Sequence, residues 1–251
     1  MALIVQKYGG SSLATLDCIR EVARRVSQRK KEGNDLVVVV SAMGNATNDL
    51  LKLAHEITEQ PAARELDMLL SAGERISMSL LAMALHTIGE PSISFTGSQS
   101  GIVTDTSHTH AKILEIRADR IKEQLGLGKV VIVAGFQGVS TQKEVTTLGR
   151  GGSDVTAVAL SVALSAKQCE FYKDVDGVYT KDPNHDADAQ KMERCDYDRV
   201  LSLVHEGAKV LHPEALVLAK KYSIPLYVAS SFNQCIGTTI EHSSSHQSSH
   251  I

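Results

Sequence analysis

The sequence has few cysteines, little net charge and no long apolar run, and each shortage excludes a class of protein. Its four cysteines form no Cys-x-x-Cys pair and follow no secretory leader, so we expect neither disulfides nor a thiolate zinc site. A formal charge of -3 with dispersed basic residues gives no general attraction for nucleic acid. No apolar run approaches the roughly 18 residues of a membrane span. We therefore expect a soluble, cytoplasmic protein without nucleic-acid or membrane partners.

Two common phosphate-binding signatures are also absent. The chain contains no G-x-x-x-x-G-K-[ST] sequence, which argues against a P-loop nucleotide site. It contains no G-x-G-x-x-G sequence either, which argues against a dinucleotide-binding βαβ unit. Any phosphate site must therefore use other glycine-rich turns.

Short β-branched runs alternate with segments of helical periodicity along most of the chain. The expected strands lie at 2–6, 35–41, 92–95, 129–135, 168–174 and 224–230. The expected helices lie at 12–32, within 46–60 and 65–87, at 111–124, after 154, at 197–206 and at 213–222. The VVVV and VVIVA runs are apolar throughout, as a sheet covered on both faces requires. We predict an α/β fold, a three-layer α/β/α sandwich with an open, mostly parallel sheet.

The composition changes near residue 241. Residues 1–240 have the apolar content of a folded domain, whereas 241–251 are rich in Ser and His and poor in apolar residues. We interpret 241–251 as a disordered tail or a remnant of cloning.

The segment TLGRGGSD, at 147–154, is the most informative one. Its glycines, Gly149, Gly151 and Gly152, allow positive φ angles and close approach to a ligand, and Ser153 and Asp154 are natural first residues for a helix. Arg150 presents the planar donor fork that suits a carboxylate or phosphate. A plain turn with a helix cap is the alternative.

Other expected strand ends also carry polar residues, and in a parallel sheet such ends gather at one edge. KYGGSS at 7–12 places Lys7 beside a glycine turn whose amides could hold a phosphate, although a simple turn explains it equally well. SAMG at 41–44, with Thr47, is a further anion candidate, and a plain turn is again the alternative. Glu74 follows in an apolar helical segment, where it must either face water beside Arg75 or meet a cation such as a substrate ammonium. The residues alone favour the exposed position.

Two later segments add charged groups. YKDVDGVYTKDP at 172–183 carries Asp174, Asp176 and Asp182, which could hold Mg²⁺ or a ribose or could simply form turns. GAKVLHPEA at 207–215 carries Lys209, a candidate phosphate contact, and His212, for which we favour a structural role.

Taken in order, KYGGSS, SAMG, SAGE, GFQG, TLGRGGSDVTA, DVDGVYTKDP and GAKVLHP resemble the catalytic domain of the aspartokinases, within the amino acid kinase superfamily. The resemblance covers nearly all of 3–240, and TLGRGGSD, SAGE and GAKVLHP distinguish it from uridylate and glutamate 5-kinases. It implies the amino acid kinase fold and the ATP-dependent, Mg²⁺-assisted phosphorylation of the β-carboxylate of L-aspartate to 4-phospho-L-aspartate. That reaction begins lysine, threonine and methionine biosynthesis.

The resemblance also implies residue roles. Lys7 stabilises the transferring phosphoryl group and Asp154 organises that lysine. The implied substrate contacts are Ser41, Thr47, Glu74 for the ammonium, Arg150 for a carboxylate, and Ser153. The implied nucleotide or phosphate contacts are Gly9, Gly10, Ser11, Lys173, Asp174, Tyr179 and Lys209. No residue is assigned as a metal ligand. Residues 1–140 then serve mainly the substrate and 141–240 mainly the nucleotide, and the superfamily suggests a homodimer.

The chain departs from the aspartokinase pattern in three ways. Lys173 stands where the family usually has Thr or Ser, and Asn184 stands where it has Arg, so ATP binding is expected to weaken unless Lys173 replaces the charge. The chain also stops near 240, before the paired ACT domains, so we expect no feedback inhibition by lysine or threonine. The alternatives are a related kinase for another carboxylate and a non-catalytic nucleotide-binding sensor.

Overall fold

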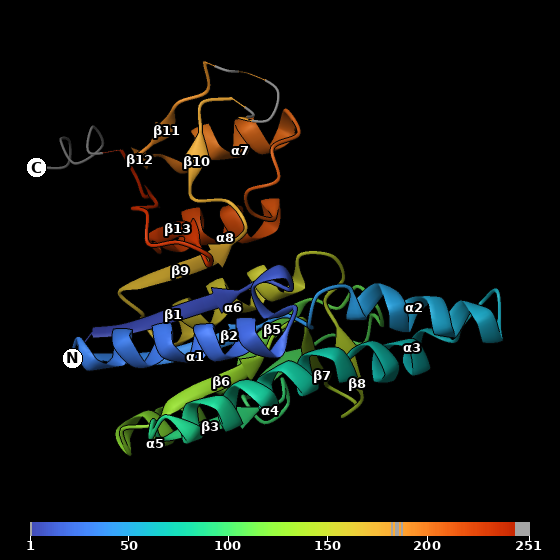
Figure 1. Ribbon diagram of the computed structural model, residues 1–251. Helices are drawn as coiled ribbons and strands as arrows, with labels where there is room; N and C mark the ends of the chain where they lie inside the picture. Colours follow the sequence, from blue (N-terminus) through green and yellow to red (C-terminus); the bar gives the residue numbers. More distant parts are fainter. Residues whose placement is uncertain (1, 182, 184–185, 187, 244–251) are drawn as a thin grey trace, which may run out of the picture.

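The computed structural model describes residues 2–181, 183, 186 and 188–243, and within them an eight-stranded sheet forms the centre of the molecule (Figure 1). The strands lie in the order β12-β14-β13-β9-β1-β2-β6-β3. Every neighbouring pair runs parallel except β13 and β14. Their bounds are β1 Ala2–Tyr8, β2 Asn34–Val40, β3 Ser92–Phe95, β6 Val130–Ala134, β9 Gln168–Lys173, β12 Arg194–Cys195, β13 Leu226–Ser230 and β14 Thr238–Ile240.

Helices cover both faces of this sheet. Along β2 the apolar side chains alternate, so Val37 and Val39 join one buried cluster while Val38 and Val40 join the other. The helices α1 (Leu16–Lys31) and α4 (Ala72–Thr87) pack on the second cluster. The helices on the first cluster are α5 Asp119–Gly126, α6 Gly152–Ala163, α7 Tyr197–His205 and α8 Pro213–Tyr222. The predicted three-layer α/β/α sandwich with a mostly parallel sheet is confirmed.

A smaller mixed sheet and two helices lie beside the main sheet. The small sheet has the order β5-β4-β7-β8, with β4 Ile102–Thr104, β5 Ile113–Ile116, β7 Gln137–Ser140 and β8 Val145–Thr147. The helices α2 (Ala46–Ile57) and α3 (Ala63–Leu70) extend outward on the same side of the molecule (Figure 1). Between β9 and β12, β10 (Val178–Tyr179) and β11 (Lys191–Met192) form a two-stranded ribbon.

The predicted helix at 111–124 is wrong. Its first part is the strand β5, which pairs antiparallel with β4, and its second part is the separate helix α5. The short apolar run Ile113–Ile116 fits a strand and a helix equally well, so periodicity could not separate the two. The antiparallel pairing with β4, a strand that the sequence analysis did not predict, makes this segment a strand.

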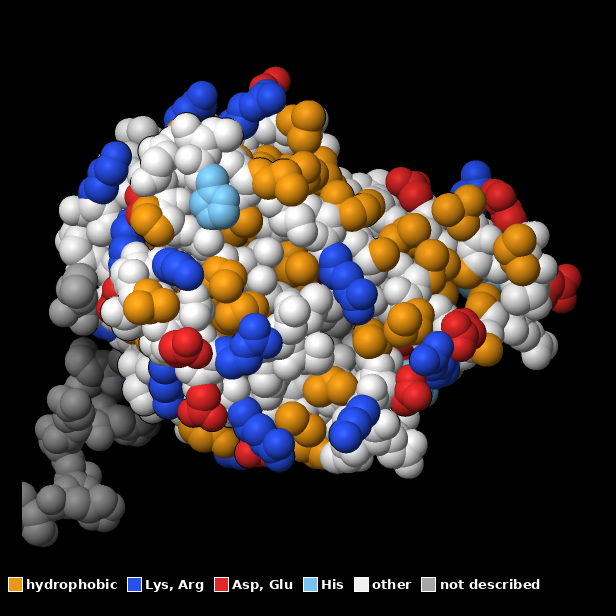
Figure 2. Space-filling model, turned by 90° about the horizontal axis from the view of Figure 1, so that it is seen from below, with side chains coloured by type: hydrophobic (Ala, Val, Ile, Leu, Met, Phe, Trp, Pro, Cys, Tyr) orange, Lys and Arg blue, Asp and Glu red, His pale blue; other side chains and the backbone are white. Residues whose placement is uncertain are grey.

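The helical run Ala63–Thr87 is long and apolar enough to cross a membrane by length and composition. Half of its most apolar window is buried, and Met78, Leu81 and Leu85 pack into the core beneath α4. Figure 2 views the molecule from the side that carries α4 and α5, and it shows hydrophobic side chains interspersed with Lys and Arg. The run is therefore half inside the fold, as a core helix of a globular domain is.

Candidate active site

The ammonium of Lys7 and the carboxylate of Asp154 form a buried ion pair. Lys7 lies near the carboxyl end of β1, and Asp154 lies in the first turn of α6. The Nζ–Oδ1 distance is 2.7 Å, and each side chain is 8% exposed. Burial alone would raise the pKa of Asp154, but the charges of Lys7 and then Lys173, with hydrogen bonds from Lys7 and the His212 amide, hold it below its ordinary value. The Asp154 carboxylate thus stays ionised and holds the Lys7 ammonium at the carboxyl end of the central strand β1.

The glycine-rich turn before α6 places Asp154. Gly149 and Gly151 have φ angles of 76° and 74°, as expected for glycines in a tight turn. Gly152 differs from the expectation because it is the first residue of α6 and its φ is not positive. A Cβ at Gly152 would lie 2.8 Å from that of Leu148, so this glycine permits close packing instead.

Gly10, which follows β1, packs closely against Gly44 in the loop after β2. A Cβ at Gly10 would lie 2.9 Å from the carbonyl oxygen of Gly44, and the Gly44 amide donates to the Gly10 carbonyl over 2.9 Å. A Cβ at Gly9 would lie 3.7 Å from the Nζ atom of Lys7, so Gly9 lies beside the ammonium. A single 3-10 turn, η1 (Ser11–Leu13), follows before α1 begins. The expected helix therefore starts later than Ser12, although Ser11 remains close to Gly9 and Gly10 in the chain.

Glu74 is buried at the start of α4, and the expected exposed position beside Arg75 is wrong. The side chain is 3% exposed, and Oε1 accepts a hydrogen bond from the Ala42 amide over 3.1 Å. Oε2 is buried without a hydrogen-bond partner. Burial raises the pKa of Glu74 from 4.5 to about 7, against the lowering effects of backbone hydrogen bonds and the Lys7 charge. A buried carboxylate with one free oxygen is suited to accept a ligand's N–H group.

The three predicted substrate contacts with hydroxyl groups, Ser41, Thr47 and Ser153, differ in burial and in their contacts. The hydroxyl of Ser77 donates to the Ser41 carbonyl over 2.7 Å, which ties the loop after β2 to α4. Ser153 is buried, and a Cβ at Gly135 would lie 2.8 Å from its Oγ, so the glycine after β6 leaves space for it. Thr47 lies in the first turn of α2 and is half-buried. The sequence had not identified Gly135 individually, although it lies in the GFQG motif.

Arg150 and Lys209 are the exposed cations of the predicted site. Arg150 lies in the turn before α6, and Lys209 lies in the segment between α7 and α8. Neither forms an ion pair or hydrogen bond within the part of the chain that the structure describes. Both side chains are therefore available to an anionic ligand.

The segment after β9 carries the other predicted nucleotide residues. Lys173 ends β9 and donates a hydrogen bond to the Val210 carbonyl, whereas the neighbouring Asp174 is exposed. The Tyr179 hydroxyl donates to Asp176 Oδ1 over 2.9 Å, and Lys191 contacts the other oxygen of that carboxylate. Two residues singled out in the sequence, Asp182 and Asn184, lie outside the described residues.

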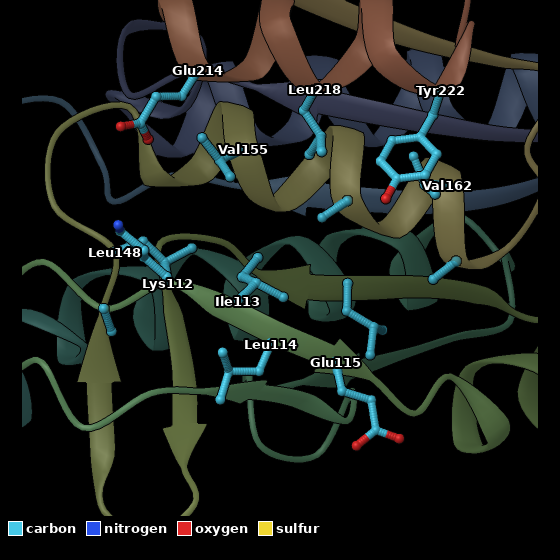
Figure 3. Close-up of a pocket in the computed structure, with 14 residues that line it drawn as sticks. Lys112, Ile113, Leu114, Glu115, Leu148, Val155, Val162, Glu214, Leu218 and Tyr222 are labelled. Carbon is cyan, nitrogen blue, oxygen red and sulfur yellow. The ribbon is translucent and has the colours of Figure 1, made fainter.

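A mainly apolar hollow of about 400 Å³ lies between β5 and the helices α6 and α8. In Figure 3, Val155, Leu218 and Tyr222 extend from the helices toward Ile113 and Leu114 of the strand. Its charged lining residues are Lys112, Glu115 and Glu214, which Figure 3 labels. The hollow contains none of the residues predicted for phosphoryl transfer, so we assign it no part in the site.

Comparison with known proteins shows the family of the chain. The model of the amino acid kinase family matches residues 2–230, so the chain belongs to that family. The similar curated proteins are aspartokinases. The one from Bacillus sp. (strain MGA3) is 52% identical over 241 residues, which cover 96% of this chain and 59% of the relative. The one from Corynebacterium glutamicum is also 52% identical over 241 residues, covering 57% of its length. The chain thus spans a little over half the length of these relatives.

Solved structures give the same picture. Aspartate kinase from Synechocystis matches with a TM-score of 0.87 and 46% identity, over 99% of this chain and 41% of that one. E. coli aspartokinase III in complex with aspartate and ADP matches with a TM-score of 0.87 and 26% identity, over 97% of this chain and 65% of that one. UMP kinase from Bacillus anthracis, 20% identical with a TM-score of 0.70, shares the fold.

Proposed function

We propose that this chain is the catalytic domain of an aspartate kinase, which transfers the γ-phosphoryl group of ATP to the β-carboxylate of L-aspartate. The observation that carries the proposal is the buried Lys7–Asp154 pair at the carboxyl edge of the sheet, with the free oxygen of Glu74 on the same edge. The aspartokinase relatives and the E. coli structure with aspartate and ADP support the choice of substrates.

In this proposal, Lys7 supplies positive charge where the transferring phosphoryl group develops negative charge. Asp154 keeps the ammonium in place because one of its oxygens lies 2.7 Å from Nζ. The attacking group is a carboxylate that is already ionised at neutral pH, so the reaction needs no general base. The protein's part is then to position the two reactants and to stabilise charge.

Glu74 and Arg150 define an acceptor with an ammonium and a carboxylate. The free Oε2 of Glu74 would accept the α-ammonium of aspartate, and the exposed Arg150 would bind a carboxylate in a two-point manner. Ser41, Thr47 and Ser153 would complete the pocket. Mainly residues 1–140 contribute to this half of the site.

On the nucleotide side, mainly within 141–240, Lys209, Asp174 and Tyr179 would contact ATP, with Gly9, Gly10 and Ser11 along the phosphate path. No group of three or more His, Cys, Asp or Glu occurs among the described residues that could hold a metal. Both oxygens of Asp154 are engaged, by Lys7 and by the His212 amide. That donor set fits an Mg²⁺ ion held mainly by ATP phosphates, which would neutralise phosphate charge when bound.

Trapping the acyl phosphate tests the activity directly. The protein is incubated with ATP, Mg²⁺ and L-aspartate in the presence of hydroxylamine, and the hydroxamate is measured. We expect hydroxamate with aspartate and not with glutamate. Product only with another carboxylate would identify a related kinase. Nucleotide binding without any hydroxamate would identify a sensor, and either result would overturn the proposal.

We also propose a cytoplasmic homodimer. The surface between α1 and α4 exposes Leu16, Met83 and Ile88, which a second copy would cover. Light scattering after size-exclusion chromatography checks this, because a monomeric mass at micromolar concentration would contradict it.

A further inference from the structure

Lys173 occupies a place where the aspartokinase pattern has Thr or Ser, and its long side chain makes a contact that those residues could not make. It ends β9, next to β1, and is partly buried. Its Nζ donates a hydrogen bond to the carbonyl of Val210, in the segment between α7 and α8. A Thr or Ser hydroxyl lies one carbon from Cα, so it would not reach across to that carbonyl.

The segment that Lys173 holds, 208–212, carries Lys209 and is anchored at a second point. The backbone N–H of His212 donates to Asp154 Oδ2 over 3.2 Å, and the His212 ring covers Gly151. Lys209 itself is exposed and makes no ion pair with a described residue. The residue that follows Lys209 is therefore fixed through its carbonyl, while the Lys209 side chain stays free for a ligand.

The charges around Lys173 suit this contact. Burial lowers the pKa of Lys173, Asp154 opposes that change, and the neighbouring charge of Lys7 adds to it. Asp154 thus acts on two lysines: it pairs directly with Lys7, and its charge favours the charged form of Lys173. An ammonium in such surroundings needs a strong acceptor, and the Val210 carbonyl supplies one.

We propose that Lys173 is a positioning residue that clamps the 208–212 segment and thereby presents Lys209 to the nucleotide phosphates. This inference rests on the proposed function, because it assigns Lys209 to ATP. In this proposal Lys173 does not contact the phosphates directly, as the aspartokinase resemblance implied, but acts on them through Lys209. It also couples the two sides of the site, since the clamped segment and Lys7 share Asp154.

A double-mutant cycle tests the indirect role. We expect Lys173→Met to raise the KM for MgATP about tenfold while kcat and the KM for aspartate change less than threefold. Lys173→Arg, which keeps a charged donor, should recover most of the loss. In the proposal, Lys173 acts on ATP only through the contact between Lys209 and the phosphates. Adding Lys173→Met to Lys209→Met should therefore raise the KM for MgATP by less than a further twofold. Lys167→Met, at an exposed residue just before β9, is the matched control and should leave KM unchanged.

Hydrogen exchange of the ligand-free protein supplies a readout that does not depend on catalysis. We expect the amides of 209–212 to exchange at least fivefold faster in Lys173→Met than in the parent and the Lys167→Met control. Fully multiplicative effects on KM, or unchanged exchange at 209–212, would overturn the clamp in favour of direct phosphate contact. If the parent makes no aspartyl hydroxamate, the proposed function fails, and the exchange result still decides whether Lys173 clamps the segment.

Discussion

Glu74 accepts a hydrogen bond from the Ala42 backbone amide through one oxygen and buries its other oxygen without a partner. The Ala42 amide belongs to the loop after β2, and Glu74 belongs to the first turn of α4. A buried carboxylate that is only half satisfied lowers stability when it is ionised, unless a ligand completes its hydrogen bonds. The first two predictions follow from this relationship.

Replacing Glu74 with Gln should stabilise the protein at alkaline pH. The pKa of Glu74 is raised to about 7 in the folded state, so the native protein binds more protons than the unfolded chain between pH 4.5 and about 7. Stability is therefore lost as pH rises through that window. We expect Glu74→Gln to raise the free energy of unfolding at pH 8 by on the order of 2 kcal/mol, and by less at pH 5. Urea titrations at both pH values measure this, and equal gains would contradict the assignment.

The affinity for aspartate should increase with pH through the same group. Only ionised Glu74 can pair with the substrate ammonium, and its pKa in the free protein is about 7. Between pH 6 and pH 8 the KM for aspartate should fall about tenfold, as the ionised fraction rises. The KM for MgATP serves as the internal control. In Glu74→Gln the KM for aspartate should be high and independent of pH; a slope that persists in this variant assigns the titration to another group.

Removing either member of the Lys7–Asp154 pair should abolish turnover. Loss of one preorganised charge or donor commonly lowers kcat by 10² to 10³. Here Lys7 stabilises the charge of the transferring phosphoryl group and Asp154 holds Lys7 in place, so both residues serve the same interaction. Lys7→Ala and Asp154→Ala should each reduce kcat by about 10³ or more and retain the native circular dichroism spectrum at 25 °C. The double variant should be little worse than either single variant. Near-normal turnover in either single variant refutes the assigned roles.

Gly151 should tolerate alanine far less well than Gly128 does. Both have φ near 75°, so alanine costs about 1 kcal/mol of backbone strain at either position. A Cβ at Gly128 meets no atom within 4 Å, whereas one at Gly151 would overlap the His212 ring. We expect Gly128→Ala to lose only that strain energy in thermal unfolding. Gly151→Ala should lose at least twice as much and should also lose activity, because displacing His212 disturbs its hydrogen bond to Asp154. Equal losses would show that φ alone governs both sites.

Much of this architecture could be predicted from local patterns. The apolar runs that became β2 and β6 specified buried parallel strands, because only a sheet covered on both faces tolerates valines on every side. The polar residues that follow those strands then indicated a single polar site along the carboxyl ends of the parallel strands. The run Ile113–Ile116 resisted prediction, because its pairing partner in β4 is set by long-range contacts rather than by periodicity.

By itself the sequence determined the α/β/α class, six of the strands of the main sheet with most of the helices around them, and the chemical types gathered where those strands end, because these depend on periodicity and residue type. Only the tertiary structure decided which of these groups meet. Glu74 is buried because α4 packs against the loop after β2, and Lys173 reaches Val210 because β9 ends beside the segment before α8. Such contacts join residues far apart in the chain, and burial and ionisation follow from the contacts rather than from the residue alone.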